Sequence, residues 1–323
     1  MKAIQIMAPE KVEIVDVPVP EAQDSEVLVK IVTVATCPHW DISLYRGIDI
    51  LERPGHPVYP IPVGFPGHEM AGEVVAVGPG ANTFKVGDRV ATTRTAGTTK
   101  PGFYCEYINR PEDMLAQVPD NISYEGAATM ELARHVASHI RVANFKDLRV
   151  GVTGLGGGGL ISLQMVKALG AREVVGIDID ASRLVLAAKL GADETVNTTV
   201  EGDLAGLEAH PLEASVDCSG AAAGLQVALD HTRGPVAIFG MVHGDATFSM
   251  RHWLQNTSIV ERKAPNRSDT EFVQDLWRKG KLNTEVLISA RMPFENYEAG
   301  VKMLMERRAI KVCFYPGKTN TDE

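Results

Sequence analysis

Alternating apolar and polar positions dominate the first hundred or so residues of the chain. Short runs in which every second side chain is apolar are separated by proline and glycine, a pattern typical of β-strands joined by turns. These runs are EVLVKIVTV, MAGEVVAVG, GDRVATT and FYCEYI. This part of the chain is therefore predicted to be rich in β-structure.

The pattern changes near Asp147. The run LRVGVTG is followed by a cluster of glycines and then by a helix whose apolar positions fall on one face, at Leu160, Leu163, Val166 and Leu169. The segments REVVGIDID, ASVDCSG and GPVAIFG are predicted strands, and SRLVLAAKLGA is a predicted helix. Strands that alternate with helices predict a parallel sheet of the doubly wound α/β type.

Two domains are expected from a chain of 323 residues. The C-terminal segment ISARMPFENYEAGVKMLMERRAIKVCFYP contains a strand, a helix and a final strand, which we assign to the first domain. The predicted division is 1–135 with 275–323 for the β-rich domain, and 136–274 for the parallel-sheet domain. We expect Trp253 and Trp277 to lie in the core.

Composition narrows the class of protein. The formal net charge of −9 and the lack of a lysine and arginine cluster argue against a nucleic-acid surface. No apolar run approaches the ~18 residues of a membrane span. The N-terminal segment alternates without the apolar core of a signal peptide. Cysteines at 37, 105, 218 and 313 show no disulfide spacing. We therefore expect a cytoplasmic protein that binds neither membranes nor nucleic acid.

A dinucleotide site is predicted where the first strand of the α/β domain meets its helix. Gly154, Gly156 and Gly159 fit G-x-G-x-x-G, with Gly157 and Gly158 in the same cluster. In this motif the glycines allow a tight turn, a close approach to a pyrophosphate and close helix packing. The alternative is a glycine-rich turn that binds no ligand.

The choice of dinucleotide depends on the end of the next strand. Asp178 ends that strand, where an acidic side chain binds ribose hydroxyls and would repel a 2′-phosphate, so NAD is favoured over NADP. Arg183 could stack on the adenine or soften this preference. Phe239 and Met241 close a later strand and are expected to line the cofactor. The alternative is that Asp178 merely caps the helix at Ser182.

A second polar group surrounds the stretch GHEMAGEV. His68 and Glu69 are metal-competent side chains beside an apolar strand, Cys37 follows an earlier strand, and Glu131 lies just before the α/β domain. Zinc takes cysteine, histidine and carboxylate ligands, and a catalytic zinc keeps one position open. From the residues alone, a core cysteine and a surface turn remain the alternatives. His135 and His139, four apart on a predicted helix, are a further possible metal pair.

Longer segments resemble a known family. GHEMAGEVVAVGPGANTFKVGDRV, GFYCEY, VTGLGGGGLISLQMVKALGA and FENYEAGVKMLMERRAIKV are similar to the medium-chain dehydrogenase/reductase family, in its zinc-dependent alcohol and polyol dehydrogenase branch. The resemblance implies a Rossmann domain beside a β-rich, GroES-like catalytic domain. It also implies hydride transfer between an alcohol and NAD, with zinc polarising the alcohol oxygen, in a homodimer or homotetramer.

The resemblance also implies roles for individual residues. Cys37 and His68 correspond to zinc ligands, Glu69 to a third ligand or a close neighbour, and Glu131 to the variable fourth ligand. His39 stands where the family has the Ser or Thr that starts the proton relay. The alternatives are that it competes as a metal ligand or that it only lines the loop.

Two departures from the family pattern bear on the metal. The segment from Cys37 to Asp41 is one residue longer than usual. The lobe that holds a structural zinc is replaced by the short loop ATTRTAGTTKPG, so one zinc is expected.

The sequence is also compatible with two other functions. One is a zinc-free enoyl or quinone reductase on the same fold, against which Cys37, His68 and Asp178 argue. The other is an NAD-binding protein without activity. That reading is disfavoured because buried polar ligands without a metal are costly.

Overall fold

The chain divides into two compact units, and the second is inserted into the sequence of the first. We describe residues 1–50, 53–95, 97–260 and 263–317 of a computed structural model. The first unit comprises Met1–Glu131 and the chain from Thr284 onward, and the second comprises Leu132–Asn283. The sequence predicted boundaries after residues 135 and 274. In the structure the first boundary lies after Glu131, and the second lies after Asn283, nine residues later than predicted.

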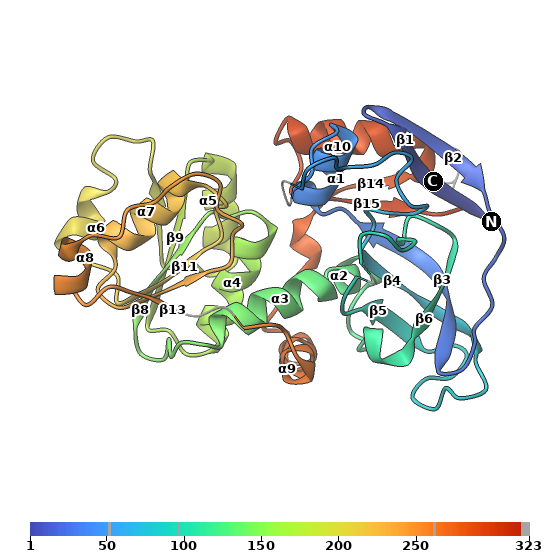
Figure 1. The fold of residues 1–323 in the computed structure, drawn as a ribbon. Coiled ribbons are helices and arrows are strands. Elements are labelled where there is room, and N and C mark those ends of the chain that lie inside the picture. Colours follow the sequence, from blue (N-terminus) through green and yellow to red (C-terminus); the bar gives the residue numbers. More distant parts are fainter. Residues whose placement is uncertain (51–52, 96, 261–262, 318–323) are drawn as a thin grey trace. The chain divides into compact units, whose positions relative to one another are not determined.

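The first unit is built on sheets whose strand pairs are antiparallel, except for the parallel pair of the two C-terminal strands (Figure 1). Within the described residues its larger sheet has the order β14-β15-β3-β4-β5-β7, with β6 also paired to β3, and β1 and β2 form a separate pair. The strands are β1 Lys2–Ala8, β2 Lys11–Asp16, β3 Glu26–Ala35, β4 Glu69–Val77, β5 Arg89–Thr92, β6 Tyr107–Pro111, β7 Leu115–Gln117, β14 Ile288–Pro293 and β15 Lys311–Tyr315. The C-terminal strands β14 and β15 therefore extend a sheet begun by the N-terminal segment, as the sequence predicted.

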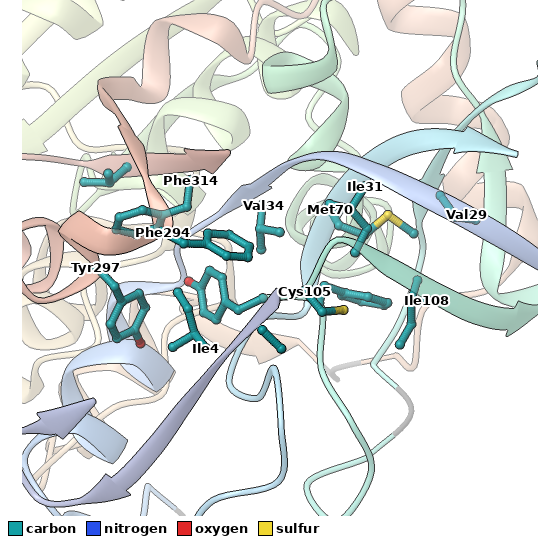
Figure 2. Close-up of a cluster of buried hydrophobic side chains, with 14 of the residues drawn as sticks. Ile4, Val29, Ile31, Val34, Met70, Cys105, Ile108, Phe294, Tyr297 and Phe314 are labelled. Atoms are coloured by element: carbon teal, nitrogen blue, oxygen red, sulfur yellow. The ribbon is translucent and has the colours of Figure 1, made fainter. Parts of the chain in front are cut away.

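Short helices complete this unit. They are α1 Pro38–Tyr45, η1 Glu112–Met114, α2 Tyr124–Ala128, η2 Glu285–Leu287, η3 Phe294–Asn296 and α10 Tyr297–Met305. Helix α3, Met130–Ile140, begins in the first unit and continues into the second. The core beside α10 contains aromatic rings in edge-to-face contact, with the Tyr104 ring 5.1 Å from that of Tyr297 and 5.9 Å from that of Phe314. Figure 2 labels Tyr297 and Phe314 in this core.

The second unit is a parallel sheet between helices. Its described strands run in the order β10-β9-β8-β11-β12-β13. The chain therefore starts in the middle of the sheet, moves to one edge, and then returns to build the other half. This is the strand order of a doubly wound dinucleotide-binding fold. The strands are β8 Arg149–Thr153, β9 Glu173–Asp178, β10 Glu194–Asn197, β11 Ala214–Asp217, β12 Pro235–Ile238 and β13 Ser258–Val260.

Helices lie between these strands along the chain, one more follows the last strand, and several of them bury apolar side chains against the sheet. They are α4 Gly157–Ala168, α5 Ala181–Lys189, α6 Ala205–Ala209, α7 Ala222–His231, α8 Met250–Leu254 and α9 Arg267–Arg278. One apolar cluster joins α7 to β12 through Leu225, Leu229 and Val236. Trp277 is buried as expected, whereas Trp253 was placed wrongly: it is 65% exposed because the short helix α8 buries His252 and turns its other side chains outward.

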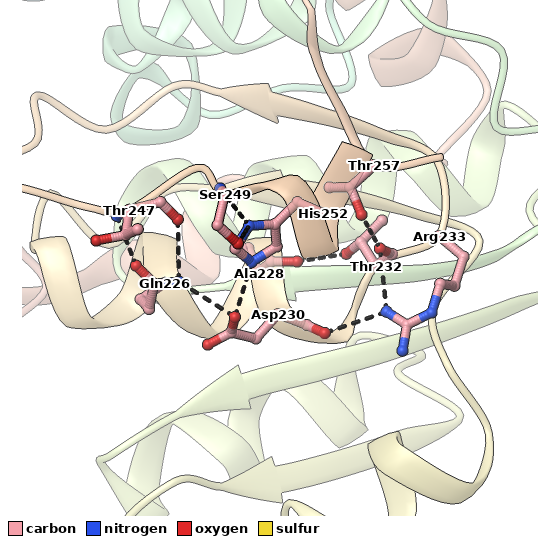
Figure 3. A network of polar contacts seen from close by, with 9 residues as sticks. All are labelled: Gln226, Ala228, Asp230, Thr232, Arg233, Thr247, Ser249, His252 and Thr257. Atoms are coloured by element: carbon pink, nitrogen blue, oxygen red, sulfur yellow. Dashed lines mark hydrogen bonds and ion pairs between the residues drawn. The ribbon is translucent and has the colours of Figure 1, made fainter. Parts of the chain in front are cut away.

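Helix α8 is fixed by a local polar network (Figure 3). The backbone N–H of Ser249 donates to Nδ1 of His252 at 2.8 Å. The proton of this ring is therefore on Nε2, which donates to Oδ1 of Asp230 at 2.8 Å. Because α8 is too short to be stable alone, it depends on this network, which ties it to α7.

Candidate active site

The candidate metal ligands come together where three neighbouring strands begin or end. Ala35 at the end of β3 pairs with Glu69 at the start of β4, and it also pairs with Cys313 of β15. Cys37 follows β3 and occupies the N-cap position of α1. Antiparallel pairing thus brings residues from distant parts of the sequence to one end of the sheet.

Gly67 precedes His68 because no side chain fits at this position. A Cβ atom at Gly67 would lie 2.8 Å from the backbone nitrogen of Tyr104 and 2.9 Å from the carbonyl oxygen of Gly64. A side chain there would push apart the segments that hold His68. The glycine is therefore required by close backbone packing beside the site.

Cys37, His68 and Glu69 form a compact donor set. One possible ligand atom from each lies within 4.8 Å of the other two. Nε2 of His68 is also 4.0 Å from Oε2 of Glu131. His68, Glu69 and Glu131 are buried, while Cys37 is partly exposed. Among the described residues this is the group whose spacing suits a metal ion, and it has the cysteine, histidine and carboxylate chemistry that zinc prefers.

The ring of His68 is oriented for metal binding. Its Nδ1 lies 2.8 Å from the carbonyl oxygen of Pro66. Because a carbonyl oxygen can only accept, Nδ1 carries the proton and donates it. The lone pair of the neutral ring is then on Nε2, which faces the donor set.

The electrostatics of the site favour a cation. Burial alone would lower the pKa of His68, but Cys37, Glu131 and Glu69 raise it, and the net result is a pKa well above the ordinary value. Burial raises the pKa of Glu69, an effect opposed by Lys311 and His68. Acidic groups thus outnumber basic ones in a buried cluster, which is the environment that a divalent ion neutralises.

Asp41 fixes the backbone of Cys37 through hydrogen bonds. Its Oδ2 accepts from the backbone N–H of Cys37 at 2.8 Å, while its own N–H donates to the Cys37 carbonyl at 2.9 Å. Its Oδ1 accepts from the hydroxyls of Tyr104 and Tyr297, both at 2.7 Å. Burial raises the pKa of Asp41, and these donors oppose the shift. The longer spacing from Cys37 to Asp41 is accommodated as the first turn of α1, with Pro38 after the cap.

The histidines outside this donor set have other surroundings. His39 lies in the first turn of α1, and its part in proton transfer stays a prediction. Nδ1 of His139 donates to the carbonyl of His135 at 2.7 Å, and its ring contacts Phe239. The ring of His139 is therefore engaged with its own helix, and neither histidine is part of the metal-competent group found among the described residues.

The glycine loop of the second unit has the predicted form. Gly154 has φ +81°, and a Cβ on Gly159 would lie 1.9 Å from the carbonyl oxygen of Gly154. Gly156 is the N-cap of α4 and has no neighbour within 4 Å of a Cβ position, so space is open at the helix start. A Cβ on Gly158 would meet the ring of Phe239, and Gly157 begins the helix.

Asp178 faces this loop and does not cap the following helix. Its Oδ2 accepts from the N–H of Leu155 at 2.5 Å, and Arg183 Nη1 lies 3.9 Å away. The cap of α5 is Asp180, which accepts from the N–H of Ser182. The reading of Asp178 as a helix cap is therefore wrong. Met241, beyond β12, is 46% exposed.

Comparison with known proteins adds independent information. The family model described as zinc-binding dehydrogenase matches residues 157–276, and the alcohol dehydrogenase GroES-like domain matches residues 23–120. The chain is 30% identical to D-arabitol-phosphate dehydrogenase of Enterococcus avium, over 97% of this chain and 96% of that protein. The chain belongs to the zinc-binding dehydrogenase family.

Further similarities agree with this assignment. Sorbitol dehydrogenase of Bacillus subtilis is 31% identical over 98% of both chains. The crystal structure of galactitol-1-phosphate dehydrogenase from Escherichia coli superposes with a TM-score of 0.84 at 23% identity, covering 98% of this chain and 100% of that one. The resemblance and the fold class predicted from sequence are confirmed, and this dehydrogenase acts on CH–OH groups as its family does.

Sequence reasoning missed two residues of the site in this zinc-binding dehydrogenase. Asp41 was noted only for its spacing, although it holds the backbone of Cys37. Lys311 was not singled out, yet it contacts Glu69 across 242 positions of sequence. A lysine at the start of an apolar strand is the single sequence signal that could have marked it.

Proposed function

We propose that this protein oxidises a small polyol or secondary alcohol with NAD, using one zinc ion held in the first unit. The observation that carries the proposal is the buried set of Cys37, His68 and Glu69, with Glu131 beside it. No other role explains as well why acidic and soft donors are gathered where burial makes unpaired charge costly. A zinc ion bound there would supply Lewis acidity to the alcohol oxygen while NAD accepts the hydride.

The protein's own residues prepare that chemistry. Cys37 is anchored through its backbone by Asp41, and His68 presents Nε2 because Pro66 holds its other nitrogen. His39, two residues after Cys37, is proposed to carry the alcohol proton away, since imidazole titrates near neutral pH. Burial of His68 and Glu69 excludes water from the donor set.

NAD is proposed as the cofactor rather than NADP. The carboxylate of Asp178 ends β9 beside the glycine loop, where it would bind ribose hydroxyls and repel a 2′-phosphate. The loop of Gly154, Gly156, Gly157, Gly158 and Gly159 would receive the pyrophosphate at the start of α4. Arg183, Phe239 and Met241 are proposed to line the adenine and nicotinamide ends.

The substrate class is inferred from the relatives. Those described above are named dehydrogenases of arabitol phosphate, sorbitol and galactitol 1-phosphate. A polyol is therefore the first substrate to test. The ring of Trp40 lies 6.4 Å from that of His68 and supplies an apolar wall beside the donor set.

Self-association through the second unit is part of the proposal. Strand β13 is at the edge of the described parallel sheet, and Ile259 on it is 50% exposed. Exposed apolar side chains also lie on α8, at Met250, Trp253 and Leu254. A second copy that continues the sheet at β13 would cover them. No helix in the described ranges has the length and apolarity needed to cross a bilayer, and the scattered free cysteines favour a cytoplasmic location.

The decisive experiment combines a substrate screen with metal analysis. Polyols, polyol phosphates and secondary alcohols are screened for NAD reduction, alongside zinc stoichiometry per chain. His68→Ala should lose zinc and lower kcat/KM by at least about 10³-fold, while the affinity for NAD changes little. His210→Ala, at an exposed position, is the matched control. Undiminished turnover in His68→Ala, or an active protein without zinc, would overturn the proposal and favour a zinc-free reductase.

A further inference from the structure

A buried lysine stands next to the candidate metal site. Lys311 is the first residue of β15, and its side chain is 2% exposed. Its Nζ donates to both carboxylate oxygens of Glu69 at 2.7 Å and to the carbonyl oxygen of Thr36 at 2.6 Å. All three donor hydrogens of the ammonium are thereby used. Neither ligand binding nor proton transfer accounts for it.

The lysine is held rigidly by the strand around it. Thr36 and Val312 exchange backbone and side-chain hydrogen bonds: the Thr36 N–H donates to the Val312 carbonyl, and the Val312 N–H donates to the Thr36 hydroxyl, both at 2.9 Å. Thr36 immediately precedes Cys37. Lys311 therefore joins β15, the end of β3 and the start of β4 at fixed positions around the donor set.

Lys311 would balance the charge of the donor set once a divalent ion is bound. With a divalent ion bound, the thiolate of Cys37 and the carboxylates of Glu69 and Glu131 carry three negative charges against two positive ones. The ammonium of Lys311 supplies the missing charge. An uncompensated charge at this depth is costly, so the neutral arrangement needs both the ion and the lysine.

The two glutamates also differ in their contacts. Both oxygens of Glu69 face Lys311, whereas Oε2 of Glu131 lies 4.0 Å from Nε2 of His68. Two nitrogen or oxygen ligands of a tetrahedral zinc ion with bonds of ~2.0–2.1 Å would lie about 3.3 Å apart, so a small shift of Glu131 would let one ion contact both atoms. Because both of its oxygens accept from the ammonium, Glu69 has fewer lone pairs left for an ion than Glu131 has.

We propose that Lys311 is a positioning residue: it keeps Glu69 as a counter-charge and reserves the metal for Cys37, His68 and Glu131, with the fourth position left to substrate. The inference rests on the proposed function, because it presupposes a metal in this site. Removing the ammonium frees Glu69 to enter the coordination sphere. The site then also becomes more negative, so the ion binds more tightly and the fourth position closes.

The test uses the full-length protein loaded with Co²⁺ as a spectroscopic substitute for zinc. Lys311→Met should change the visible absorption of bound Co²⁺, because an extra carboxylate alters the ligand field. Chelator competition should show the metal bound at least tenfold more tightly. Lys311→Arg should keep the spectrum of the parent protein. Adding Glu69→Gln to Lys311→Met should restore that spectrum, and this double variant also folds without an unpaired buried charge.

The outcomes distinguish the two proposals. A lysine with a merely structural role would loosen the site on replacement, so weaker metal binding by Lys311→Met would overturn the inference. An unchanged Co²⁺ spectrum in that variant, or failure of Glu69→Gln to restore it, would do the same. Lys279→Met, at an exposed position on the surface, is the control for lysine loss. A parent protein that binds neither Co²⁺ nor Zn²⁺ would overturn the proposed function itself, and the inference with it.

Discussion

At the scale of single residues, the site depends on groups that hold the ligands. Asp41 is fully buried, and it is surrounded by donors from α1, from the segment before β6 and from α10. A buried carboxylate is tolerated only when its oxygens are satisfied. The position of Cys37 is therefore coupled to a tyrosine on the C-terminal helix.

Tyr297→Phe tests this coupling. The change removes one hydroxyl from Asp41 without altering the aromatic packing, and it should lower the free energy of unfolding by about 1–2 kcal/mol. Zinc affinity should fall as well, because Cys37 loses part of its support. Thermal unfolding and chelator competition measure the two effects. Tyr107→Phe on β6 is the control, and equal zinc affinity in Tyr297→Phe and the parent would contradict the coupling.

Some of the site could be predicted from sequence and some could not. Residue type and the resemblance to a known family marked Cys37, His68, Glu69 and Glu131 as candidate ligands, and these side chains do lie close together. Lys311 could not be found in that way, since its contact with Glu69 exists only through the pairing of β15 with β3 and of β3 with β4. Local spacing carries no information about such pairings.

At the scale of elements, the junction of β8 and α4 was predicted from pattern alone. A strand, a glycine cluster and a helix follow one another closely, and their geometry is fixed by local backbone requirements. The short helix α8 was harder to predict because five residues are too few for a periodic pattern. That is why Trp253 was assigned to the core.

Two glycine substitutions in this junction should behave differently. Gly159→Ala places a methyl group 1.9 Å from the Gly154 carbonyl oxygen and should destabilise the protein by about 3 kcal/mol. Gly156→Ala meets open space and should change stability by less than about 1 kcal/mol. It should nevertheless weaken NAD binding by roughly tenfold or more, because the methyl group occupies the space proposed for the pyrophosphate.

Thermal unfolding and NAD titration of both variants check this prediction. Each variant is the control for the other, because both replace a glycine by alanine at positions three residues apart. Unaltered NAD affinity in Gly156→Ala would contradict the placement of the pyrophosphate at the start of α4.

At the scale of the whole molecule, the proposed self-association can be disrupted by one charge. Trp253→Glu places a carboxylate in the exposed apolar surface of α8 and should convert the parent oligomer to monomers, as measured by sedimentation equilibrium. Val185→Glu on α5 is the control, because Val185 is 57% exposed and lies on another helix. A monomeric parent, or an oligomer that survives Trp253→Glu, would argue against this surface as the interface.

The split first unit has a consequence for biosynthesis. Strand β15 joins a sheet whose other described strands, apart from β14, were made almost two hundred residues earlier, and Lys311 arrives with it. Before residues 311–315 are added, the nascent chain already holds its thiol, imidazole and carboxylates but lacks the ammonium that balances them. The dinucleotide-binding unit lies entirely upstream and can fold first. Such a chain is expected to acquire its metal late, only once β15 has closed the sheet.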